Sequence, residues 1–288
     1  MLTAADIVAG RAVRRQHPSL KQQHHEYVLQ RIESFKNTLS RGELMALGDE
    51  AAQELQSGAA GQFVLTEILM LETVDRVISK RLRLPSYNRW RKQIQALREA
   101  QREPIHWGMD PSSALVSLLP RLEVDDTVLV IGPGVQAEAC LLAAYGAAVT
   151  FVAEDLSGVE QMETRMAGES LGGRFLAYVA ALGEWLPPFA EPVPLVVVDA
   201  GTLGALPYAS RQALLRQAQA LSPPQGVHVI LPGDGGAAPE AYLSHYAEWE
   251  REQPSRARKG GGKASRSQGV ILTCPPTPED PGRMAAQG

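Results

Sequence analysis

The sequence is poor in several residue types that would define a protein class. Only 2 of its 288 residues are cysteines, Cys140 and Cys274, which excludes a disulfide framework. Neither cysteine nor any of the 6 histidines has partners at the spacing of zinc ligands, so we expect no bound metal. Cys140 stands in an apolar helical pattern, where a small core residue is expected.

Long hydrophobic runs are also missing. No apolar stretch reaches the roughly 20 residues that cross a bilayer. The first residues, Met-Leu-Thr-Ala-Ala-Asp, show neither the basic segment nor the apolar segment of a signal peptide. These two absences predict a cytoplasmic protein without membrane contact.

An excess of charge of one sign is missing as well. The formal net charge is -4, so the chain lacks the broad basic footprint of a nucleic-acid-binding protein. Hydrophobic residues make up 44% of the chain, which excludes general disorder. The balance favours a globular protein with a small-molecule substrate and disfavours a nucleic-acid partner.

The residue pattern changes near residue 108. Helical, charged segments precede this point, and short Val/Ile-rich runs alternate with Ala/Leu-rich segments after it. We expect a helical domain over 1–108, a Rossmann-like α/β domain over 109–275 and a disordered tail over 276–288. The helical domain would cap a site or form a homodimer interface. The basic, glycine-rich segment 254–266 is expected to be a solvated loop.

Individual elements follow from periodicity. In the first part we expect helices over 19–38, 63–79 and 87–101, and another that begins at a capping box formed by Ser40 and Glu43. Strands are predicted over 127–131, 148–152, 174–179, 194–198, 227–231 and 269–273. Helices of the second part are predicted over 112–119, 136–144, 157–168, 208–221 and 239–252. Apolar strands that alternate with helices indicate a doubly wound, mostly parallel sheet.

The most informative motif is a glycine turn after the strand at 127–131. Gly132, Pro133 and Gly134 lead directly into the helix predicted over 136–144. Glycine permits close approach of a ligand to the backbone, and a helix N-terminus offers free N–H groups. Because ligands of such sheets bind at the carboxyl ends of the strands, this turn is a candidate cofactor site.

Acidic residues follow the next strands. Glu154 and Asp155 come after the second predicted strand, and either could accept hydrogen bonds from ribose hydroxyls. Asp199 ends an apolar strand at the same edge, where a carboxylate could bind a ligand, orient a substrate or simply cap a helix. His106 and Trp107, at the junction of the two parts, could line a pocket or pack as a hinge.

Taken together, residues 110–232 resemble class I S-adenosylmethionine-dependent methyltransferases. The resemblance lies in the lead-in helix, the run Val-Leu-Val-Ile-Gly-Pro-Gly, the second strand with its acids, and the Pro/Gly turn before the strand at 227–231. It implies S-adenosylmethionine as cofactor and methyl transfer to a small molecule. The binding residues it implies are Gly132, Pro133, Gly134, Glu154, Asp155 and Asp199.

The sequence departs from that family in places. Val130 stands where the family usually has an acid, Gln136 replaces a third glycine, and the C-terminal part is short for the family's antiparallel hairpin. Two alternatives therefore stay open. One is a non-catalytic, methyltransferase-like binding or assembly protein. The other is an NAD(P)-dependent oxidoreductase, because Gly132, Gly134 and Ala137 also satisfy the dinucleotide fingerprint.

Overall fold

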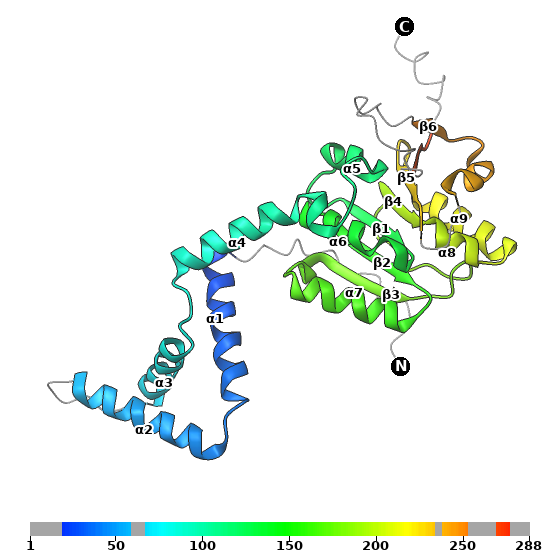
Figure 1. Ribbon diagram of the computed structural model, residues 1–288. Helices are drawn as coiled ribbons and strands as arrows, with labels where there is room; N and C mark the ends of the chain where they lie inside the picture. The colour runs from blue at the N-terminus through cyan, green and yellow to red at the C-terminus, as the bar shows by residue number, and fades with distance from the viewer. Residues whose placement is uncertain (1–18, 59–66, 234–237, 253–268, 277–288) are drawn as a thin grey trace, which may run out of the picture. The chain divides into compact units, whose positions relative to one another are not determined.

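The protein is described by a computed structural model that covers residues 19–58, 67–233, 238–252 and 269–276. The expected loop at 254–266 and residues 277–288 of the expected tail lie outside these ranges. The chain divides into two compact units, Met1–Leu97 and Arg98–Gly288, a little before the boundary expected at 108. Each unit is described separately below (Figure 1).

The first unit is helical. Its helices are α1 (Leu20–Lys36), α2 (Arg41–Gly58), α3 (Glu67–Arg81) and the first part of α4 (Tyr87–Gln101). The predicted capping box before α2 is confirmed, because the Ser40 backbone N–H and hydroxyl both donate to Glu43 while the Glu43 N–H donates to the Ser40 hydroxyl. A second capping box, formed by Ser19 and Gln22, starts α1.

A small core holds this unit together. It consists of Ile32 from α1, Leu47 from α2, and Val77 and Ile78 from α3. Helix α3 packs on both α1 and α2. Leu71 of α3 is 54% exposed, so this packing covers only part of the apolar surface of the helix.

The second unit contains a seven-stranded sheet in the order β3-β2-β1-β4-β5-β7-β6. The strands are β1 (Thr127–Ile131), β2 (Ala148–Ala153), β3 (Phe175–Val179), β4 (Leu195–Asp199), β5 (Val227–Leu231), β6 (Glu250–Glu252) and β7 (Val270–Thr273). The first five pair in parallel, and β7 pairs antiparallel with β5 and β6. The predicted doubly wound sheet is confirmed, and β6 with β7 supplies a short antiparallel hairpin.

Helices cover both faces of this sheet (Figure 1). On one face lie α5 (Ala114–Leu118), α6 (Gln136–Ala144) and α7 (Leu156–Gly168). On the other lie α8 (Ala200–Ala205), α9 (Tyr208–Leu221) and the 3-10 helix η6 (Pro239–Tyr246). Alternate residues of each central strand enter opposite cores: Val128 joins the first core and Leu129 the second. Two-sided burial explains why these strands read as continuous apolar runs.

The largest error of the sequence-based prediction concerns 239–252. The prediction of a single α-helix is wrong there, because the segment is a 3-10 helix followed by the strand β6. Tyr242 and Tyr246 of this segment pack inward and are 2% and 3% exposed. Pairing of Glu250–Glu252 with β7 satisfies backbone groups along an otherwise open sheet edge. The short helix α8 was missed altogether.

Candidate functional site

The glycine turn connects β1 to α6 at the carboxyl edge of the sheet. Gly132 has a φ of 101°, and its N–H donates to the Val152 carbonyl oxygen of β2 at 2.9 Å. Pro133 and Gly134 are exposed, and α6 begins at Gln136. The turn therefore presents exposed backbone next to a helix N-terminus, the arrangement that suits an anionic or polar ligand.

The glycines of this turn are also required by packing. A Cβ atom on Gly132 would collide with the Thr202 hydroxyl and with Asp199 Cβ. One on Gly134 would lie 2.8 Å from Asp199 Oδ2, and one on Gly233, after β5, would collide with Asp199 Oδ1. Loops that follow β1, β4 and β5 thus close around one side chain.

That side chain, Asp199, is the N-cap of α8. Its Oδ1 accepts a hydrogen bond from Gly201 N at 2.9 Å, and its Oδ2 accepts from Thr202 N at 3.1 Å and Thr202 Oγ1 at 2.7 Å. The residue is only 4% exposed. Its carboxylate therefore stabilises the helix terminus and the loop around it, which is the capping role considered for it from the sequence.

The two acids after β2 differ in their contacts. Asp155 is the N-cap of α7, with Oδ1 accepting from Gly158 N at 2.6 Å. Glu154 is exposed and lies at the very end of β2. Because Asp155 is engaged by its own helix, Glu154 is the acid better placed to meet a ligand at this edge.

Sequence reasoning missed Glu138, in the first turn of α6. Burial raises the pKa of its carboxyl to about 7, and the negative charge of Asp199 adds to this effect while Arg165 opposes it. An acidic residue that closely follows a glycine turn has an ordinary explanation, because acidic side chains are favoured in the first turn of a helix. Only its burial, which the sequence does not show, makes it unusual.

The residues at the junction pack within the second unit. The Trp107 indole N–H donates to the Gln101 carbonyl at 2.7 Å, and the Arg165 guanidinium lies over its ring at 5.4 Å. His106 Nε2 lies 3.7 Å from a Glu169 carboxylate oxygen. Trp107 is 7% exposed, so it serves the core of this unit.

Two departures from the methyltransferase pattern have structural explanations. Val130 is fully buried in the first core, so its position faces helices and offers no place for a charged side chain. Gln136 is the first residue of α6 and has ordinary helical backbone angles, with φ -66° and ψ -36°, so the chain does not need glycine there.

Comparisons with known proteins find similarity only among solved structures. No protein-family model matches the chain, and no curated protein sequence matches it. Among solved structures it is similar to the glycopeptide N-methyltransferase MtfA complexed with S-adenosyl-L-methionine, with 18% identity and a TM-score of 0.36. That alignment covers 42% of this chain and 54% of MtfA, so the chain spans about half of that structure.

Two further solved structures are similar to the chain, also at low sequence identity. The N-methyltransferase NodS from Bradyrhizobium japonicum WM9 is 14% identical, with 56% of this chain and 92% of NodS covered and a TM-score of 0.42. The CcbJ methyltransferase from Streptomyces caelestis is 22% identical over 42% of this chain and 49% of CcbJ, with a TM-score of 0.37.

Within the residues that the structure describes, no helix is long and apolar enough to cross a membrane. Among the same residues, no group of three or more histidine, cysteine or acidic side chains is arranged to hold a metal ion.

Proposed function

We propose that the protein is an S-adenosylmethionine-dependent methyltransferase that acts on a small molecule. The observation that carries the proposal is the pairing of the exposed Pro133–Gly134 turn with the exposed Glu154 at the end of the neighbouring strand. These groups lie at the edge of the sheet where ligands of doubly wound folds bind. Their chemistry suits a ligand that has both a polar chain and a ribose.

Each part of the site would have a distinct task. Backbone groups of Pro133 and Gly134, with the N-terminus of α6, would bind the amino-acid part of the cofactor. Glu154 would accept hydrogen bonds from the ribose hydroxyls. Asp199 would position the glycine turn, because its carboxylate lies against the turn and fixes the start of α8.

S-adenosylmethionine supplies a methyl group on a sulfonium when bound. The chain's own contribution would be to align the acceptor and to exclude water. Glu138, with its raised pKa, is the side chain near the turn that could take a proton from an acceptor at neutral pH. The helical unit would select the acceptor or form a homodimer interface, which sedimentation velocity of the full chain would test.

Calorimetric titration with S-adenosylhomocysteine and S-adenosylmethionine tests the proposal directly. Glu154→Gln should weaken binding about tenfold, which corresponds to about 1.4 kcal/mol for a charged hydrogen-bond acceptor. Glu160→Gln is the matched control, since Glu160 is an exposed acid on α7 that is not part of the proposed site. Gly134→Arg should abolish binding.

The alternatives predict other results. Binding of NADH or NADPH without S-adenosylmethionine would replace the transferase with an oxidoreductase. No binding of any of these ligands would favour the non-catalytic binding protein, for which the buried Val130 is the supporting observation. Equal affinities of the Glu154→Gln and Glu160→Gln variants would remove Glu154 from the site.

A further inference from the structure

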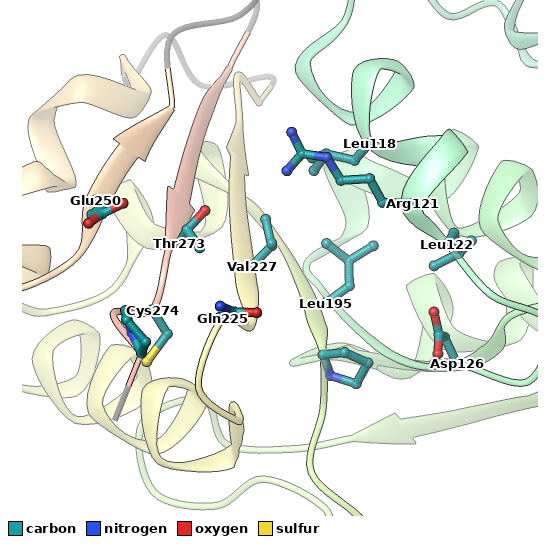
Figure 2. A pocket seen from close by; sticks show the side chains of 12 residues that line it. Leu118, Arg121, Leu122, Asp126, Leu195, Gln225, Val227, Glu250, Thr273 and Cys274 are labelled. Carbon is teal, nitrogen blue, oxygen red and sulfur yellow. The ribbon is translucent and has the colours of Figure 1, made fainter. Parts of the chain in front are cut away.

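At the opposite edge of the sheet a pocket of about 550 Å³ opens, where β1, β4 and β5 begin and where the antiparallel β7 ends. Figure 2 shows Arg121 and Leu122 on one side, Leu195 and Val227 in the middle, and Thr273 and Glu250 on the far side. The glycine turn takes no part in this lining, because it follows the other end of β1.

The base of the pocket is apolar. Leu118 and Leu195, which belong to the first core of the sheet, are 5% and 6% exposed, and Val227 and Leu122 pack against the same core. A volume of this size lies within the range of about 300–1,000 Å³ that is typical of small-molecule sites. The pocket can therefore hold an organic molecule with an apolar body.

Among the described residues of the lining, the basic side chain is Arg121, and it is already paired. The Arg121 guanidinium donates to both carboxylate oxygens of Glu252, at 2.8 and 3.0 Å. The Thr273 hydroxyl donates to the same carboxylate at 2.9 Å. This bidentate ion pair occupies the guanidinium N–H groups that would otherwise bind an anion. It also holds β6 and β7 in place on that side of the pocket.

Two further carboxylates give the pocket its negative character. Asp126 lies just before β1, where its Oδ2 accepts from Glu123 N at 2.7 Å, and Glu250 is exposed at the start of β6. Figure 2 places them on opposite sides of the opening. With Arg121 neutralised by Glu252, the described part of the lining carries these two negative charges over an apolar base.

We propose that this pocket binds a small organic amine, with its apolar body on Leu195 and Val227 and its protonated nitrogen near Asp126 or Glu250. The apolar base supplies affinity, and the carboxylates select a cation over an anion of the same shape. Because the pocket is open to solvent, the expected affinity is weak, with a dissociation constant in the millimolar range. This site is independent of the proposed cofactor site.

Cys274 provides a built-in reporter. Its half-buried thiol lines the pocket, whereas Cys140 is fully buried in α6 and burial raises the pKa of its thiol to about 11. Iodoacetamide should therefore alkylate Cys274 selectively in the folded protein, because the thiolate is the reactive form. A ligand in the pocket should slow this reaction, which mass spectrometry can follow.

The experiment compares three probes of nearly equal shape: phenylbutylamine, phenylbutanol and phenylbutyrate. At ten times its dissociation constant a ligand leaves about one tenth of the sites empty, so the amine should slow alkylation up to about tenfold. The alcohol should protect less and the carboxylate least. Equal protection by all three, or none by the amine at millimolar concentration, would overturn the proposal.

Substitutions of the two carboxylates test where the amine binds. Glu250→Gln should weaken protection by the amine about two- to fivefold, as expected for one partly exposed charge, and combination with Asp126→Asn should weaken it further. Glu248→Gln is the matched control, an exposed acid that does not line the pocket. Equal effects of Glu248→Gln and Glu250→Gln would overturn the location. Protection that persists in Glu154→Gln would separate this site from the cofactor site.

Discussion

The two edges of the sheet use the same strands in different ways. At the carboxyl edge, loops close around Asp199, and the exposed groups are mainly backbone atoms and Glu154. At the amino edge, side chains form the surface, with an apolar base below an ion pair and the two acids Asp126 and Glu250. Backbone geometry defines the first edge, whereas side-chain chemistry defines the second. Substitutions and pH should therefore affect the two edges differently.

Lowering the pH should have the largest effect on the stability of the protein, through a residue near the amino edge of the sheet. Burial lowers the pKa of His228 to about 3 from an ordinary value of 6.5, and its ring nitrogens contact the Ser222 and Tyr246 hydroxyls at 2.8 and 2.9 Å. Between these pH values the unfolded chain binds the extra proton, so stability is complete above pH 6.5 and falls as the pH drops toward 3. The loss reaches about 4 kcal/mol.

Urea unfolding between pH 7 and pH 4 measures this effect. His228→Asn removes the titrating group, so the variant should be less stable at pH 7 but should lose less stability toward pH 4. If the free energy of unfolding falls equally with pH in both proteins, His228 is not the cause of the loss in acid.

Gly132→Ala should cause the next largest loss, at the carboxyl edge. The new Cβ would collide with Thr202 and Asp199, and the φ of 101° at this position is unfavourable for any residue with a Cβ. The collision and the backbone strain together predict a loss of about 3 kcal/mol in the free energy of unfolding. Gly168→Ala is the control, because no atom lies within 4 Å of its Cβ position at the end of α7. Thermal unfolding of both variants should separate them clearly, and similar stabilities would contradict the packing described here.

Glu138→Gln should change stability in the opposite pH direction from His228. Burial raises the pKa of Glu138 from 4.5 to about 7, so the folded chain binds the extra proton in this window. Stability is complete below pH 4.5 and is lost as the pH rises through 7, by about 1–2 kcal/mol after allowance for partial exposure. The variant should therefore gain stability relative to the parent at pH 8 but not at pH 4. An equal difference at both values would exclude this titration.

Arg121→Ala should have the smallest effect. The guanidinium is 61% exposed, and the net contribution of its pair with Glu252 should be about 0.5 kcal/mol. A double-mutant cycle with Glu252→Ala measures the pair separately from each side chain. A coupling energy near zero would mean that the pair orders β6 without stabilising the fold.

Sequence patterns predicted most of the second unit because the central strands β1, β2, β4 and β5 are buried on both faces. The bounds of β1, β5, α6 and α9 agree with the predictions, since glycine, proline or polar residues flank each apolar run. The segment 239–252 failed because its tyrosines have helical spacing although its last residues pair with β7. The pocket at the amino edge could not be predicted, because its lining comes from five separate segments whose proximity depends on the sheet order.

The cofactor site stays a prediction, although its parts follow neighbouring strands at one edge of the sheet. The glycine turn follows β1, and Glu154 and Asp155 follow β2. Local sequence could not tell which of these two acids caps a helix. Asp199 shows the same difficulty, since its partners Gly134 and Gly233 lie far from it in the chain. Glu138 was missed because its burial depends on tertiary packing.

The position of β4 between β1 and β5 has a consequence for folding during synthesis. Strand β1, with Val128 to Ile131 fully buried in the finished sheet, pairs on one side with β2 and on the other with the much later β4. Until β4 leaves the ribosome, one edge of β1 stays open and apolar, and such edges attract other chains. The central strand pair, which joins distant segments, is therefore expected to set the folding rate.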